Sequence, residues 1–84
     1  MLNMSVVTGL TALAWIVREP ERLERMLGLT GLSPDDLRAR ADEPALLAAV
    51  LAYLEAHEPD LVACADAIEQ KPADLVAARR VLEA

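Results

Sequence analysis

Apolar side chains recur at helical spacing along the chain, and the pattern is interrupted by residues that begin or end helices. In the first such stretch, Val6, Leu10, Leu13 and Val17 recur three or four positions apart, with Ala14 beside them, and we expect this stripe to face the core. No segment of the sequence has the period-two alternation that is typical of a half-buried strand. The pattern predicts an all-α fold, a compact bundle of five or six short helices. The expected helices span residues 5–18, 21–28, 34–41, 45–54, 60–70 and 72–82.

The clearest boundary is a glycine-containing turn followed by a capping sequence. Gly28 and Gly31 can both adopt the left-handed conformation that closes many helices. Ser33 is a favourable N-cap, Pro34 suits the first helical position, and Asp36 lies three residues after the cap. This spacing approximates a capping box. We therefore expect one helix to end near Gly28 and the next to begin at Pro34.

The segment 45–54 is apolar on every helical face, and the hydroxyl of Tyr53 is its only polar side-chain group. Such a helix is expected to be buried on all sides, either as the central helix of the domain or in an oligomer interface. Large aromatic and apolar residues are where binding energy concentrates. The alternative for Trp15 and Tyr53 is that they fill a core with few other large side chains. The candidate partner-binding residues are Trp15, Leu47, Val50, Tyr53 and Leu54.

Short strings in the first half of the chain recur in the second half. Leu-Ala-Trp at residues 13–15 matches Leu-Ala-Tyr at 51–53, and Pro-Asp-Asp-Leu at 34–37 matches Pro-Ala-Asp-Leu at 72–75, both at an offset of 38 residues. Glu-Pro at 19–20 matches Glu-Pro at 58–59 at an offset of 39, so the spacing nearly repeats. One interpretation is a pseudo-repeat of two three-helix units. The other is that short matches arise by chance in a chain rich in Ala and Leu. Both remain open at the level of the sequence.

Size and charge narrow the class of protein. The 84 residues are 55% hydrophobic, which is enough for the core of a single helical domain spanning residues 1–84. The net charge of −6 disfavours binding to nucleic acid or to an anionic membrane. Residues 1–17 carry no charge, but polar residues interrupt them and they are too short to span a bilayer. We expect this segment to be a buried amphipathic helix of a cytoplasmic protein.

Catalytic and ligand-binding motifs are sparse in this sequence. The three glycines form no phosphate-binding loop, and the single His57 and single Cys64 lie seven positions apart across a Glu-Pro break. We expect His57 at a helix end and Cys64 packed as a small apolar residue. The sequence therefore predicts a non-enzymatic protein with no catalytic residue, no metal site and no cofactor.

A helix-turn-helix interpretation of residues 21–41 offers an alternative function, that of a DNA-associated regulator. In this interpretation Arg38 and Arg40 on the second helix contact base edges. It requires that these two arginines face solvent without acidic neighbours. Asp35 and Asp36 at the start of the same helix oppose it, because they would lie beside DNA phosphates.

Two strings resemble a known family. They are Glu-Pro-Glu-Arg-Leu at residues 19–23 and Leu-Thr-Gly-Leu-Ser-Pro-Asp-Asp-Leu-Arg at residues 29–38. Together with Leu-Ala-Trp at 13–15 they are similar to the Domain of Unknown Function 3572 family, small proteins of alphaproteobacteria, over about residues 5–67. The family has no established activity, so the resemblance carries over no catalytic or cofactor residue. Its association with genes for single-domain response regulators implies a signalling or regulatory accessory role.

The function expected from the sequence is therefore that of a small acidic protein-interaction module. Its partner would be another protein or a second copy of the chain, bound through an apolar patch surrounded by acidic residues. A homodimer is one form of this expectation, whereas nucleic acid and membrane are not expected as partners.

Overall fold

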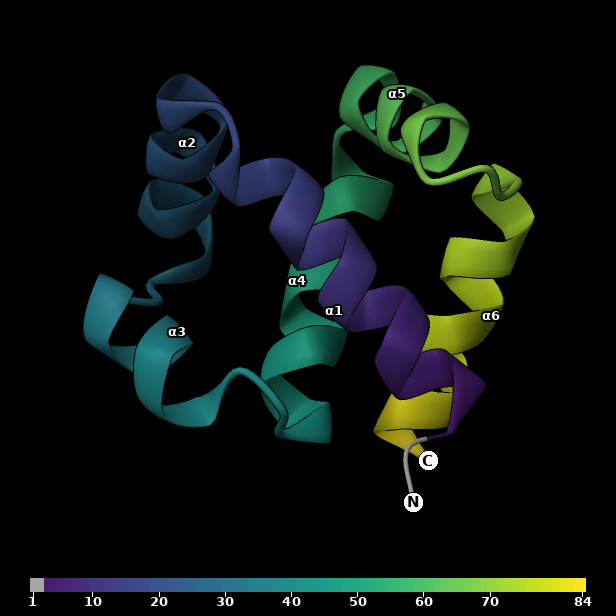
Figure 1. The fold of residues 1–84 in the computed structure, drawn as a ribbon, viewed down its shortest axis with the longest axis horizontal. Helices are drawn as coiled ribbons and strands as arrows, with labels where there is room; N and C mark the ends of the chain where they lie inside the picture. Colours follow the sequence, from purple (N-terminus) through teal and green to yellow (C-terminus); the bar gives the residue numbers. More distant parts are fainter. Residues whose placement is uncertain (1–2) are drawn as a thin grey trace.

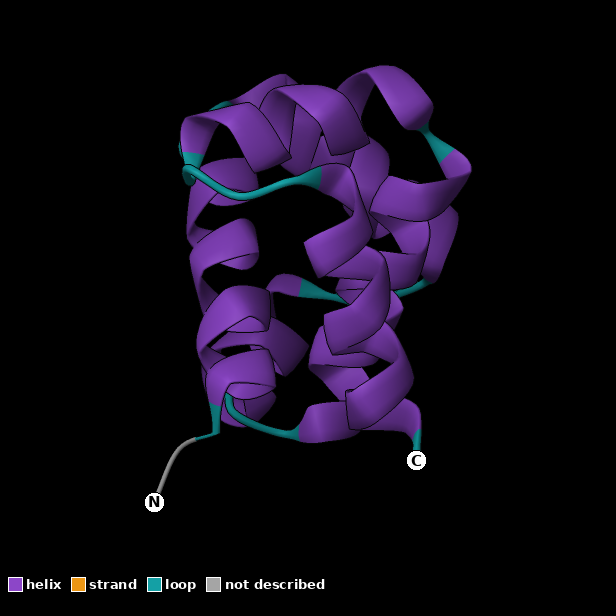
Figure 2. Ribbon diagram, turned by 90° about the vertical axis from the view of Figure 1, so that its right-hand side faces the viewer, coloured by secondary structure: helices purple, strands orange, loops and turns teal. Residues whose placement is uncertain are grey.

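The computed structural model describes residues 3–84, and within them the chain forms six α-helices and no strand (Figure 1). The all-α prediction is confirmed, and Figure 2 shows the helices joined by short loops. The helices are α1 (Met4–Val17), α2 (Pro20–Thr30), α3 (Pro34–Arg40), α4 (Pro44–Ala56), α5 (Glu58–Ala67) and α6 (Pro72–Glu83).

Proline and a capping box set the helix boundaries. Each helix from α2 to α6 has a proline in its first or second position, where the missing N–H costs no helical hydrogen bond. At the start of α3, the Ser33 hydroxyl accepts from the Asp36 N–H at 3.1 Å, and the Asp36 carboxylate accepts from the Ser33 N–H at 2.9 Å. The predicted capping box is therefore confirmed.

The end of α2 differs from the prediction. The helix continues through Gly28 to Thr30, and only Gly31 adopts the left-handed conformation, with φ +79°. The Gly31 N–H donates to the Leu27 carbonyl at 3.0 Å and closes the helix. Glycine permits a left-handed turn without requiring one, so the sequence alone could not decide which glycine ends the helix.

Helix α4 is the central helix of this chain. Seven of its residues are buried. Helices α1 and α6 pack along it and against each other, while α2 and α5 also contact both α1 and α4 (Figure 1). Most of the apolar surface of α4 is therefore covered within one chain.

Helix α1 buries most of the predicted stripe, since Val6 and Leu13 are buried and Leu10 packs partly buried against the core. Its buried residues include Val6, Gly9, Leu13 and Ile16, whereas Val17, expected in the core, is 44% exposed. Because no residue of α1 is charged, the sequence pattern does not mark which face points to solvent. Gly9 faces Leu47 of α4, and its lack of a side chain lets the two helices approach closely at this point.

The two halves of the chain share an order of elements but differ in packing. Both contain three helices, α1–α3 and α4–α6. Helix α6 packs against α1 and α4 and buries Leu75, Ala78 and Leu82. Helix α3, its counterpart by position, has no fully buried residue and contacts the core through partly buried Leu37 and, just beyond its end, Ala41.

Candidate functional site

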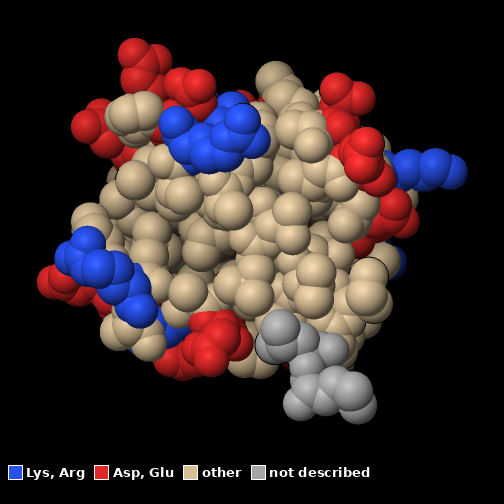
Figure 3. Space-filling view, viewed as in Figure 1, with Lys and Arg blue, Asp and Glu red and all other residues tan. Residues whose placement is uncertain are grey.

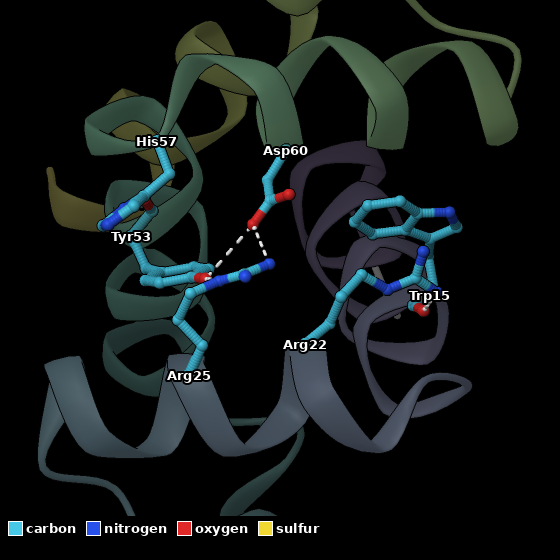
Figure 4. A network of polar contacts seen from close by, with 6 residues as sticks. All are labelled: Trp15, Arg22, Arg25, Tyr53, His57 and Asp60. Atoms are coloured by element: carbon cyan, nitrogen blue, oxygen red, sulfur yellow. Dashed lines mark hydrogen bonds and ion pairs between the residues drawn. The ribbon is translucent and has the colours of Figure 1, made fainter.

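A polar network joins α2, α4 and α5 (Figure 4). The Arg25 guanidinium donates to the Tyr53 hydroxyl at 3.1 Å and pairs with the Asp60 carboxylate at 3.0 Å. The Tyr53 hydroxyl in turn donates to the same carboxylate oxygen at 3.2 Å. The hydrogen bond to Tyr53 and the charge of Asp60 raise the pKa of Arg25. Arg25 therefore pairs with Asp60 on another helix. The four-residue spacing between Glu21 and Arg25 would instead favour an ion pair within α2.

A second arginine of α2 covers the indole of Trp15. The guanidinium carbon of Arg22 lies 3.6 Å from the ring centroid of Trp15, and its Nη2 donates to the Trp15 carbonyl at 2.6 Å. Its Nε atom is buried and has no hydrogen-bond partner among the described residues. The helical pattern suggests that Arg22 faces water, but the guanidinium instead stacks on an aromatic face and shields it from solvent. Both arginines thus act as packing elements between helices.

The two candidate reactive side chains, His57 and Cys64, have structural roles in this fold. The Nδ1–H of His57 donates to the Tyr53 carbonyl at 2.9 Å, and its ring stacks on that of Tyr53 with 4.6 Å between centroids. Cys64 is fully buried, and burial raises the pKa of its thiol to about 11, which keeps it protonated at neutral pH. Within residues 3–84, no three His, Cys, Asp or Glu side chains converge as metal ligands would.

The five candidate partner-binding residues all lie in the core, so they form no surface patch in this fold. Trp15 and Tyr53 are 8% and 5% exposed, and the three aliphatic residues of α4 are fully enclosed. These residues are buried because the neighbouring helices of the same chain cover α4. The enclosed residues are Leu47, Val50 and Leu54.

The two arginines of the DNA-binding interpretation each have an acidic neighbour. Arg38 pairs with Asp35, and Arg40 pairs with Glu43 at 3.1 Å and with Asp36 at 3.8 Å. All of these residues lie on α3 or directly after it. The acid-free arginine edge required by the DNA-binding interpretation is therefore not formed.

An uncharged apolar surface is found instead on the outward side of α1, formed by Met4, Val7, Thr11, Ala14 and Val17. We call these five exposed residues the α1 face. Met4 is 75% exposed and Val7 38%, and Val81 of the neighbouring α6 is 56% exposed. In Figure 3, which shows the molecule from the side on which α1 crosses α4, the middle of the surface carries no charged residue and the charges lie around its rim. A surface pocket of about 410 Å³ lies between α1 and α6, and Met4 and Val81 are among the residues that line it.

Sequence reasoning missed this surface, although its signal was present. The uncharged segment 1–17 predicts a buried amphipathic helix, and its apolar stripe places Ala14 and Val17 toward the core. The structure shows that an uncharged helix can have an exposed side.

The protein is thus a small, acidic, all-α protein, and one of its helices has an exposed, uncharged and partly apolar face. The chain belongs to the family described as protein of unknown function (DUF3572), whose family model matches residues 4–84. This match confirms the resemblance seen in the sequence and extends it to the end of the chain. No curated protein and no solved structure matches the chain significantly. None of the helices within residues 3–84 combines the length and the apolarity needed to cross a bilayer.

Proposed function

We propose that this protein is a non-enzymatic protein-interaction module of the cytoplasm, with a regulatory or signalling role, and that its partner docks on the α1 face. The observation that carries the proposal is an exposed, uncharged helix face with apolar residues along its length, on a chain whose net charge is −6. Contiguous apolar surface surrounded by polar residues is typical of protein-interaction sites.

The energetics of the α1 face support binding to another protein surface. Burial of apolar area stabilises a complex by about 25 cal/mol per Å² before association costs are subtracted. The only side-chain hydroxyl of the face, that of Thr11, already donates to the Val7 carbonyl at 2.7 Å. A partner can therefore cover this face without leaving a charged group or an unsatisfied hydroxyl buried.

The substitution Val7→Lys tests this proposal, with Val62→Lys as its matched control. Both valines lie on exposed helix sides, 38% and 50% exposed, and both substitutions change the net charge by the same amount. We expect Val7→Lys to weaken association by about tenfold or more, because an ammonium group would lose its hydration in the interface. Association is measured as molar mass by light scattering and as retention of partner proteins in affinity capture.

Both variants should keep the unfolding free energy of the wild type within about 0.5 kcal/mol, since neither valine belongs to the core. The proposal is wrong if Val7→Lys retains every association that Val62→Lys retains. It is equally wrong if the wild-type protein is monomeric and captures no partner.

A further inference from the structure

We propose that residues 32–42, which contain α3, form a strap that opens and closes over the core while the other five helices keep their packing. The strap lies outside the α1 face, and its opening does not depend on the proposed function. Three observations carry the inference: the strap is only partly buried, its polar contacts are local, and the helices on either side of it are closed without it.

The strap has little contact with the rest of the molecule. Each of the other five helices packs against at least two of the others, whereas α3 makes only slight contact with any helix. No residue of α3 is fully buried, and the strap reaches the core through three partly buried side chains, those of Leu32, Leu37 and Ala41. In Figure 1, α3 lies at the edge of the molecule. The packing of the other five helices therefore does not run through α3.

The polar contacts of the strap are local. Arg38 pairs with Asp35, and Arg40 pairs with Asp36 and with Glu43, which directly follows the strap. The capping box of α3 is also internal to the strap. Within the described chain, no ion pair or side-chain hydrogen bond of residues 33–42 reaches α1, α2, α5 or α6. The strap can therefore move as one body without breaking polar contacts to these helices.

The helices on both sides of the strap are closed by their own hydrogen bonds. The Gly31 N–H donates to the Leu27 carbonyl at 3.0 Å at the end of α2, and the Leu47 N–H donates to the Glu43 carbonyl at 3.1 Å at the start of α4. Neither bond involves a residue of the strap. Gly31, which is left-handed and has open space beside its Cα, supplies one hinge, and the turn at residues 41–43 supplies the other.

Opening changes the apolar surface of the molecule. Burial of Leu32 and Leu37 favours the closed state, because apolar area is then removed from water. Since so few side chains hold the strap, its opening requires less free energy than unfolding of the whole chain. The fold thus contains an apolar surface that is hidden in the closed state and becomes accessible in the open state.

Limited proteolysis with trypsin tests the strap, because a peptide bond inside a helix is cut only when that helix opens. Arg40 of the strap and Arg25 of α2 form a matched pair. Their side chains are 44% and 47% exposed, and each is held in an ion pair. We expect cleavage after Arg40 to be at least about tenfold faster than cleavage after Arg25, since the latter requires the core to open. Mass spectrometry of the fragments gives both rates.

Leu37→Ala should accelerate cleavage after Arg40 by about tenfold and leave cleavage after Arg25 unchanged, because it weakens only the closed state of the strap. Leu29→Ala is the control, since it makes the same chemical change at a leucine that is 61% exposed and lies outside the strap. It should alter neither rate. Equal rates after Arg40 and Arg25 in the wild type would overturn the proposal, and so would a Leu37→Ala variant that accelerates both cleavages equally or neither.

Hydrogen exchange of the wild type tests the strap without any substitution, and it decides the matter if Leu37→Ala does not fold. The amides of Leu37 and Glu43 donate to carbonyls of the strap, at 3.2 and 3.0 Å. Their opening constants should agree within about threefold and exceed that of Leu51, in the middle of α4, by at least about tenfold. A single opening constant for all three amides would show that the strap opens only when the whole chain unfolds, and would overturn the proposal.

Discussion

At the scale of single residues, the three glycines show how the surroundings of a residue determine its role. A Cβ atom on Gly9 would lie 3.0 Å from the Cβ of Leu47, so α1 and α4 approach each other closely at this point. Gly28 has open space around it, and Gly31 adopts a left-handed backbone that other residues rarely take. Replacing each glycine by alanine therefore has a different expected effect.

Gly9→Ala is expected to lower the free energy of unfolding, whereas Gly28→Ala should raise it. The added methyl at Gly9 meets the rigid Cβ of Leu47, which forces the helices apart at a cost of about 1–3 kcal/mol. At Gly28 the same methyl meets nothing, and alanine's helix propensity stabilises α2 by about 0.5–1 kcal/mol. Chemical denaturation of both variants measures the difference, and equal effects would contradict the close approach of α1 and α4.

Burial of Cys64 makes stability depend on pH in the alkaline range. The pKa of its thiol is about 11 in the fold against an ordinary 9.0, so the unfolded chain loses this proton first as the pH rises. The contribution is fully present below pH 9.0 and is lost as the pH rises through about 11, and the loss of unfolding free energy at pH 11 is about 2 kcal/mol. The unfolding free energy of the wild type should therefore fall more steeply over this range than that of Cys64→Ala. Parallel pH profiles of the two proteins would show that the thiol does not contribute.

At the scale of elements, α3 is the helix that depends most on local interactions. It has seven residues, none of them fully buried, and isolated helices of this length are unstable in water. Its capping box stabilises the helix in place of core burial. The hydrogen bond from the Ser33 N–H lowers the pKa of Asp36. The contribution of the ionised carboxylate is present above the ordinary pKa of 3.8 and is lost as the pH falls through the lower value.

Ser33→Ala is expected to reduce stability by about 1 kcal/mol, because the Asp36 N–H loses its acceptor. Hydrogen exchange should show the loss first in the amides of α3, which unfold locally before the core does. Ser5→Ala is the control, since Ser5 lies within α1 and caps no helix. Equal protection of α3 in the wild type and in Ser33→Ala would show that packing of Leu37, and not the cap, holds this helix.

At the scale of the whole molecule, charge and apolar surface are separated. The acidic and basic residues seen in Figure 3 lie around an uncharged centre. Several of the positive charges are paired within the chain, as Arg25 is with Asp60 and Arg79 with Glu55 and Glu83. The long-range field of the molecule is therefore negative, while its α1 face is neutral.

Self-association through a neutral face should strengthen when salt is added. Screening reduces the repulsion between two copies of charge −6, and the α1 face has no charged residue whose ion pair salt could weaken. Light scattering over a concentration series, in buffers of low and high sodium chloride, should give a lower dissociation constant at high salt. An interface held by charge pairs would show the opposite dependence.

The sequence by itself determined the helical class, most helix boundaries and the capping box at Ser33, because these depend on interactions within a few residues. It also indicated correctly that most of residues 45–54 would be buried, although Ala45 is exposed and Ala49 and Ala52 are partly exposed. Cys64 was likewise expected to pack as an apolar residue and is buried.

Only the tertiary structure decided which neighbours cover each helix. It placed Trp15 and Tyr53 in the core, paired Arg25 with Asp60, and turned Val7 and Val17 outward. These outcomes depend on contacts between residues far apart in the chain. Along α1 no charge distinguishes one side from another, and the side that contains Gly9 packs closely against Leu47 while the opposite side becomes the α1 face.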